Sequence, residues 1–68
     1  MSEYDASIVV LQAISDLGIS TTSGIVEEVG KTRRASTPFI AHITGYLIKI
    51  GLVVGYPGKG GELVFQLA

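Results

Sequence analysis

The chain has 68 residues, of which 47% are hydrophobic and none is cysteine, and its formal net charge is −1. This length predicts one small domain over residues 1–68 and excludes a second core. No apolar run approaches the roughly 20 residues that span a bilayer, and the first residues lack the positive flank of a signal peptide. We therefore expect a cytoplasmic protein, outside any membrane, that gains stability by self-association.

Charge is divided sharply along the chain. Residues 1–30 contain five acidic and no basic side chains, whereas residues 31–68 contain five basic side chains and one acidic one. The basic residues are Lys31, Arg33, Arg34, Lys49 and Lys59. This segregation predicts an anionic partner for the second part of the chain. The alternative is that surface charges fell this way by accident.

The first helix is predicted from Tyr4 to Leu17, because apolar residues recur there at spacings of three and four. Ser2 to Asp5 supplies its N-cap, and Gly18 is its C-terminal glycine. The residues expected to face the core are Val10, Leu11, Ile14 and Leu17. Ile8 and Val9 widen the apolar face, which indicates a dimer seam, although a deeply wrapped core helix would show the same pattern.

A short second helix is expected next. The segment Ile19–Ser23 is turn-like, and its hydroxyl groups can cap a helix that ends at Gly30. The residues of this helix expected to face inward are Ile25, Val26 and Val29. An exposed basic connection over residues 31–35 then leads to a third helix.

The third helix is predicted to begin with Thr37 as N-cap and Pro38 at the first helical position, where the missing N–H is harmless. It should run to about Ile50, before the terminating Gly51. On a wheel of about 100° per residue, the core face consists of Ile40, Ile43 and Leu47. The opposite stripe, directed away from the core, consists of Pro38, His42, Gly45 and Lys49.

The last 17 residues, 52–68, predict a β-hairpin with a Gly-rich tip at Gly58–Gly61. Its second strand alternates in polarity, so one face is expected to be buried and the other exposed. The residues expected on the buried face are Leu63, Phe65 and Leu67, and those on the exposed face are Glu62, Val64 and Gln66.

These segments together resemble the winged helix-turn-helix superfamily. In chain order, the resemblance rests on Val10-Leu11 with Ile14, Ile25-Val26 with Val29-Gly30, Ile40, Ile43 and Leu47, and Gly51-Leu52-Val53 before the hairpin. It implies an α+β fold of three helices followed by a C-terminal β-hairpin wing, similar to MarR-type repressors and fimbrial-operon regulators, which bind duplex DNA. The connection between the second and third helices is longer than the usual tight turn, so phosphate contacts there are not carried over residue by residue.

In the resembled superfamily the outer face of the third helix enters the major groove and the wing lies on the flanking backbone. Gly45 would remove bulk where a groove wall approaches, and Ala41 can contact a thymine methyl group. The predicted DNA-binding residues are Lys31, Arg33, Arg34, Ser36, Thr37, Ala41, His42, Gly45, Lys49 and Lys59. Several of these residues can also be explained without DNA. His42 can be a solvated imidazole, Lys49 can be stabilised by the helix dipole, and Lys59 can keep the turn soluble. The alternative for the basic cluster is a solvated loop, formed by Lys31, Arg33 and Arg34.

The sequence therefore predicts a sequence-specific double-stranded DNA-binding transcriptional regulator, acting as a homodimer through the first helix. No catalytic constellation, metal-ligand cluster or cofactor motif is present, so we predict a non-enzyme without metal or small-molecule cofactor. The alternative is a winged-helix protein interaction module that binds no nucleic acid. Its motivation is the apolar surplus at Ile8, Val9, Tyr46, Ile48 and Ile50. Binding to single strands is a weaker option, because the chain has only five aromatic residues.

Overall fold

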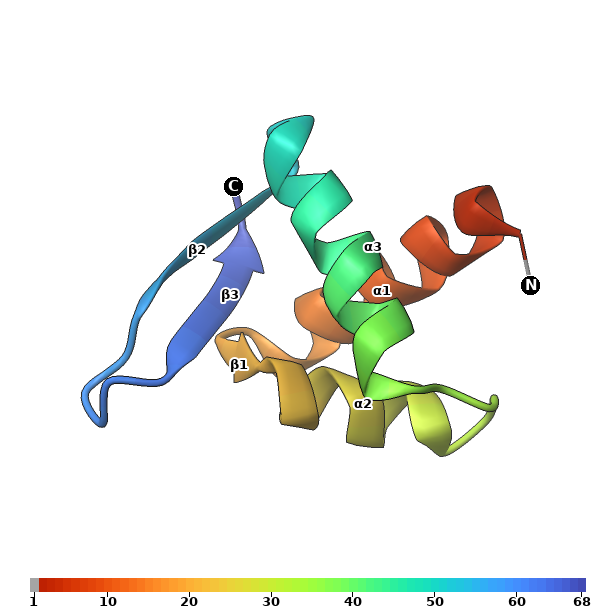
Figure 1. Ribbon diagram of the computed structural model, residues 1–68, viewed down its shortest axis with the longest axis horizontal. Helices are drawn as coiled ribbons and strands as arrows, with labels where there is room; N and C mark the ends of the chain where they lie inside the picture. Colours follow the sequence, from red (N-terminus) through yellow and green to blue (C-terminus); the bar gives the residue numbers. More distant parts are fainter. Residues whose placement is uncertain (1) are drawn as a thin grey trace.

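Three helices pack against one another, and a small sheet lies at one side of them (Figure 1). The computed structural model describes residues 2–68. Its elements are α1 (Glu3–Leu17), β1 (Ser20–Thr21), α2 (Thr22–Gly30), α3 (Thr37–Lys49), β2 (Val53–Pro57) and β3 (Leu63–Leu67). The predicted α+β order of three helices followed by a hairpin is confirmed. None of the helices in this part of the chain is both long and apolar enough to cross a membrane.

Helix α1 has the ends that the sequence predicts. The Ser2 hydroxyl accepts a hydrogen bond from the Asp5 N–H at 3.2 Å, and Gly18, with φ 77°, donates its N–H to the Ile14 carbonyl. The buried residues of α1 are Ala6, Val10, Ala13 and Ile14. The inward placement of Leu17 was wrong: it is 39% exposed, because it lies in the last turn, where the chain leaves the helix towards β1. Leu11 is half-buried.

Helix α2 begins where a strand ends. The Thr21 hydroxyl accepts a hydrogen bond from the Gly24 N–H at 3.2 Å, as the predicted capping requires. The segment predicted to be only a turn also contains β1, which pairs antiparallel with β3. Of the predicted inward residues, Ile25 and Val29 are buried, whereas Val26 is only half-buried against the core.

Helix α3 begins one residue earlier than predicted. Ser36, not Thr37, is the N-cap: its backbone is extended, and its hydroxyl accepts a hydrogen bond from the Phe39 N–H at 3.3 Å. Thr37 is the first helical residue, so Pro38 still lies in the first turn, where no N–H partner is needed. The predicted core face of Ile40, Ile43 and Leu47 is confirmed, each being at most 1% exposed.

The sheet has the strand order β1-β3-β2, with both pairs antiparallel. The predicted burial of β3 was wrong at three positions. Leu63 and Leu67 are 54% and 42% exposed, because they lie at the two ends of the strand, while Phe65 at its centre is buried. Val64, expected outside, is buried too, because the hairpin turn folds over it: a Cβ at Gly58 would lie 3.1 Å from a Val64 methyl carbon.

Candidate nucleic-acid interface

The stripe predicted on α3 is exposed. Helix α3 lies in front of α1 in Figure 1. Its residues Ile40, Ile43 and Leu47 are buried in the shared core, on the side opposite the stripe. The predicted outward direction of the stripe is therefore confirmed. Its residues Pro38, His42, Gly45 and Lys49 are exposed, and so is Ala41 on its flank. Most of these side chains are short, so the surface of α3 is narrow along this line.

Packing within the chain does not require a glycine at position 45. A Cβ built at this position meets no atom within 4 Å, and the backbone is helical with no positive φ. A glycine in a helix interior costs about 1 kcal/mol relative to alanine. Contacts inside the protein therefore do not account for this destabilising residue, and the free space lies on the outer surface.

His42 is the one imidazole on the stripe, and it has an acidic neighbour. Its Nε2 lies 3.5 Å from a carboxylate oxygen of Glu3, in the first turn of α1. Both side chains are largely exposed, at 63% and 72%, so this contact is weak and depends on protonation of the imidazole. Glu3 was absent from the predicted site, since only the tertiary packing of α1 against α3 brings it beside His42.

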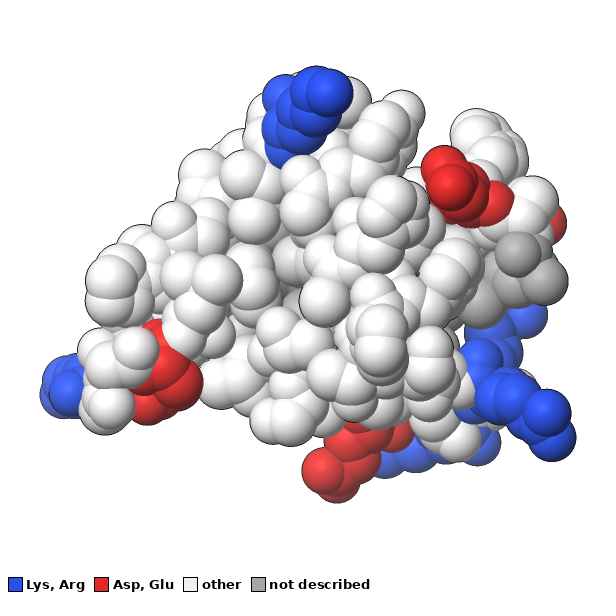
Figure 2. All heavy atoms as spheres, viewed as in Figure 1, with Lys and Arg blue, Asp and Glu red and all other residues white. Residues whose placement is uncertain are grey.

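Basic side chains lie around the rim of the face that α3 presents. In Figure 2 the centre of this face is white, and blue atoms lie at the end of α3, at the hairpin tip and at the connection between α2 and α3. These places correspond to Lys49, Lys59 and the Lys31–Arg34 segment, all exposed. Lys59 shares the hairpin tip with Glu62, whose carboxylate lies over the turn, 2.8 Å from where a Gly58 Cβ would stand. The local charge of the wing is thus partly neutralised.

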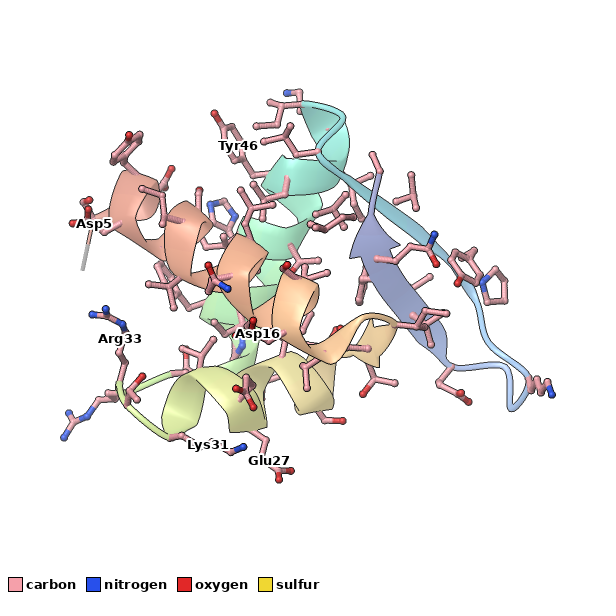
Figure 3. The ribbon with its side chains drawn as sticks, turned by 180° about the vertical axis from the view of Figure 1, so that it is seen from behind. Asp5, Asp16, Glu27, Lys31, Arg33 and Tyr46 are labelled. Atoms are coloured by element: carbon pink, nitrogen blue, oxygen red, sulfur yellow. The ribbon has the colours of Figure 1, made fainter. Side chains whose placement is uncertain are left out.

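Two basic side chains of the connection, Lys31 and Arg33, border α1 and α2. Lys31 forms an ion pair with Glu28 at 3.0 Å, and this hydrogen bond and the charge of Glu28 raise the pKa of the Lys31 ammonium. Arg33 extends towards α1 and lines a hollow with Asp5 and Ile8 (Figure 3). Lys31 and Arg33 therefore lie beside α1 and α2, away from the stripe of α3.

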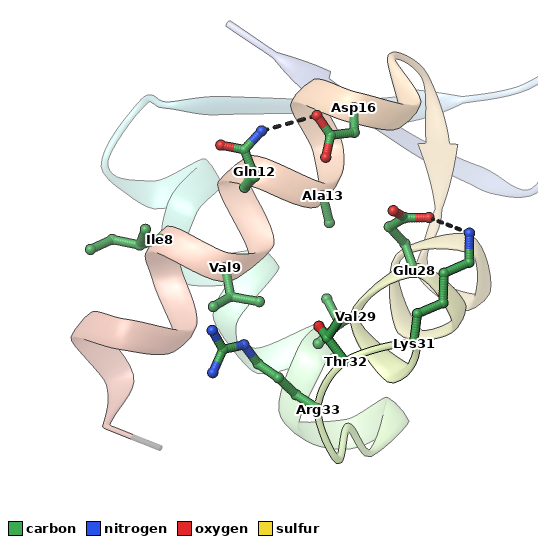
Figure 4. A pocket seen from close by; sticks show the side chains of 10 residues that line it. All are labelled: Ile8, Val9, Gln12, Ala13, Asp16, Glu28, Val29, Lys31, Thr32 and Arg33. Carbon is green, nitrogen blue, oxygen red and sulfur yellow. Dashed lines mark hydrogen bonds and ion pairs between the residues drawn. The ribbon is translucent and has the colours of Figure 1, made fainter.

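A groove of about 400 Å³ separates α1 from this connection (Figure 4). Its lining residues are Ile8, Val9, Gln12, Ala13, Asp16, Glu28, Val29, Lys31, Thr32 and Arg33. The Arg33 side chain lies alongside Val9 in the close view, and the two acidic groups already have partners, Asp16 with Gln12 and Glu28 with Lys31. The groove therefore has an apolar floor and one guanidinium at its edge.

The structure places the predicted site residues at three locations, and Arg34 is exposed in the connection before α3. Thr37, Ala41, His42, Gly45 and Lys49 belong to the exposed side of α3, with Ser36 at its start, where its hydroxyl caps the helix. Lys59 stands apart on the hairpin, and Lys31 and Arg33 border the groove. Across residues 2–68 no group of three or more His, Cys, Asp or Glu side chains is arranged to hold a metal ion.

The comparisons with known proteins identify the fold. No family model and no curated protein sequence matches the chain. Among solved structures, the crystal structure of the Zalpha domain from Carassius auratus PKZ in complex with Z-DNA is similar, with a TM-score of 0.83 and 16% sequence identity over 100% of both chains. The predicted winged helix-turn-helix fold is confirmed by this likeness. At this identity the likeness concerns the fold only.

Proposed function

We propose that this protein binds double-stranded DNA and acts as a cytoplasmic transcriptional regulator. In this proposal α3 enters the major groove and reads sequence there, while the β2–β3 hairpin lies on the flanking backbone. The observation that carries the proposal is the exposed stripe of α3, which contains no acidic residue of its own and has Lys49 at its end and Arg34 shortly before its start. The acidic side chain beside this stripe is Glu3 of α1. The fold shared with a domain crystallised on Z-DNA supports it further.

The dimensions of α3 suit the groove. Thirteen helical residues span about 20 Å at 1.5 Å per residue, and a major groove about 12 Å wide admits one α-helix. In this proposal, Lys49 at the end of α3 and Arg34, which precedes the helix, contact phosphates on either side of such a groove. Lys59 on the wing supplies a third phosphate contact, weakened by Glu62 beside it.

Binding to phosphates has a direct experimental signature. The affinity for a fluorescent 20-base-pair duplex is measured by anisotropy over a series of salt concentrations. The association constant falls as salt rises, and each phosphate contact makes the slope of log K against log salt more negative by about 0.9. We expect Arg34→Ala and Lys49→Ala each to make the slope less steep by about that amount. Lys31→Ala is the matched control and should change the steepness of the slope less, because the Lys31 ammonium is already paired with Glu28.

The variant Arg33→Ala tests whether Arg33 in the basic connection also contacts phosphates. Its side chain borders the groove beside α1, so Arg33→Ala should reduce the slope less than Arg34→Ala does. The measurement is repeated on a right-handed duplex and on an alternating C·G duplex held in the left-handed form, because the similar domain was crystallised on Z-DNA. Absence of binding to every duplex at low salt would refute the proposed function.

We also propose that the protein acts as a homodimer through α1, which would present two α3 helices to DNA. Ile8 is 51% exposed and separates the groove towards α2 from a second hollow that is lined by Leu11 and Leu67. Sedimentation at micromolar concentration should show a dimer for the wild type and a monomer for Ile8→Lys. The control is Ile19→Lys, since Ile19 is 60% exposed but lines neither hollow. A stable wild-type monomer contradicts the dimer and leaves DNA binding intact.

A protein interaction module is the second candidate function. It is favoured by exposed apolar side chains outside the stripe, among them Tyr46, Ile48 and Ile50 at 47%, 38% and 48% exposure. A stoichiometric protein partner that binds through these residues, with Arg34 and Lys49 dispensable, would support this candidate over DNA binding. The salt series above separates the two, because only the DNA-binding function requires those cations.

A further inference from the structure

The groove between α1 and the connection that follows α2 has a floor formed by the hydrophobic core (Figure 4). Ala13 and Val29 are 4% and 2% exposed and belong to the core cluster, and Val9 packs against it. Because side chains in a core are closely packed, this floor has a fixed shape. The groove volume of about 400 Å³ lies within the range of about 300–1,000 Å³ that is usual for small-molecule sites.

Two side chains that can donate hydrogen bonds lie together on one side of the groove. The N–H groups of Thr32 and Arg33 both donate to the Val29 carbonyl, at 3.2 and 3.0 Å, which holds the connection at the end of α2. Both side chains line the groove. Within residues 2–68, neither the Thr32 hydroxyl nor the Arg33 guanidinium forms a hydrogen bond or an ion pair, although Asp5 lines a neighbouring hollow with Arg33. Both donors are therefore open to an anion.

The remaining charges of the groove limit that anion to a single negative charge. Asp16 accepts a hydrogen bond from the Gln12 amide at 2.9 Å, and Glu28 pairs with Lys31 at 3.0 Å. With Arg33 included, the lining has two acidic and two basic side chains, so its formal charges cancel. Both carboxylates lie away from the Arg33 guanidinium in Figure 4. A ligand with several negative charges would meet these carboxylates, whereas one charge beside Arg33 avoids them.

From these features we infer that the groove binds a small amphipathic monoanion, an alkyl chain that ends in one carboxylate. The carboxylate lies at Thr32 and Arg33, because a guanidinium matches both oxygens of a carboxylate and a hydroxyl can donate to either of them. The alkyl chain covers the floor formed by Val9, Ala13 and Val29. This inference goes beyond the proposed binding of DNA, since no lining residue of the groove belongs to the stripe of α3.

The alkyl chain and the carboxylate contribute separately to the affinity. Each methylene group that leaves water strengthens binding by about fourfold. Lengthening a carboxylate by two methylene groups, from hexanoate to octanoate, therefore tightens binding by up to about 15-fold as long as the chain still lies on the floor. The ion pair adds at most about fivefold, because the Arg33 side chain is exposed to water. For hexanoate these contributions give a dissociation constant on the order of 10 mM.

The test is a titration of the whole chain with hexanoate, followed by the NMR chemical shifts of the backbone amides at constant pH and ionic strength. We expect saturable shifts with one dissociation constant at residues of the groove and none at Gly45 or Lys59, which lie outside it. Hexanol has the same alkyl chain without the charge and should bind up to about fivefold more weakly. Acetate has the charge without the chain and should give no saturable shift at these concentrations. Octanoate should bind more tightly than hexanoate.

Two variants connect the preference for hexanoate to the groove. Arg33→Gln should lower the affinity for hexanoate to that for hexanol and leave hexanol binding unchanged. Arg34→Gln removes the same charge from the next residue, which does not line the groove, so it should keep the preference for hexanoate.

Three results would overturn the inference. The first is equal affinity of the wild type for hexanoate and hexanol, or no saturable shift with either. The second is an unchanged preference for hexanoate in Arg33→Gln. The third is a set of shifts at the groove that follows protein concentration without any hexanoate, because a second copy of the chain then covers the groove. Each of these results leaves the proposed DNA binding in place, since that function is measured separately with duplexes.

Discussion

Gly45→Ala should make the protein more stable and make it bind DNA less well. The added methyl group meets no atom of the chain within 4 Å, and the position is helical with ordinary φ. Replacement of a helix-interior glycine by alanine then gains about 1 kcal/mol of unfolding free energy. In a domain of this size that corresponds to an increase of about 4–8 °C in the melting temperature.

The loss of binding follows from the same open space. If a groove wall approaches the bare backbone at Gly45, a methyl group there forces separation, and overpacking of this kind costs about 1–3 kcal/mol. Thermal unfolding followed by circular dichroism measures the first effect, and fluorescence anisotropy with duplex DNA measures the second. Gly45→Glu should leave the fold nearly intact and abolish binding, because it adds both bulk and negative charge.

Gly30→Ala is the matched control for Gly45→Ala. Like Gly45, Gly30 has no atom within 4 Å of its Cβ position and no positive φ, but it is the last residue of α2 and lies outside the stripe. It should stabilise the protein without changing its DNA affinity. The reasoning about Gly45 is refuted if Gly45→Ala stabilises the protein and binds DNA as well as the wild type does.

Two further predictions concern the framework that holds α3. Ser36→Ala should lower the unfolding free energy by about 1 kcal/mol in urea denaturation, because it removes the N-cap; Thr37→Ala should have a smaller effect, and the reverse order would contradict the assignment of the cap. Gly55→Val should cost about 1–3 kcal/mol, because a Cβ there lies 3.2 Å from the Phe65 ring and 3.3 Å from an Ile48 methyl carbon. An unchanged melting temperature for Gly55→Val would show that these neighbours move aside freely.

Local patterns predicted the helices well. Ile40, Ile43 and Leu47 recur at helical spacing, so their shared buried face follows from the geometry of one helix, and so does the exposed stripe opposite. The glycines that end α1 and α3 have φ of 77° and 85°, which side chains with a Cβ rarely adopt, so these ends too are determined locally.

The sheet could not be predicted to the same extent. Burial of Val64 depends on the hairpin turn folding over it, and β1 exists only because Ser20 and Thr21 pair with residues more than 40 positions away. The alternation of residues 62–67 therefore indicated a strand but did not identify its covered positions. Strands gain their partners from distant segments, so their burial is not contained in their own periodicity.

For this protein, the sequence by itself determined the order of the three helices and the hairpin, the two faces of α3 and the division of charge at residue 30. Only the tertiary structure decided which cations share a surface: it pairs Lys31 with Glu28, directs Arg33 towards α1 and brings Glu3 beside His42. The physical reason is the difference in sequence separation between the interacting residues. Helix faces and caps arise from contacts within four residues, whereas the neighbours of a surface charge depend on how whole helices pack.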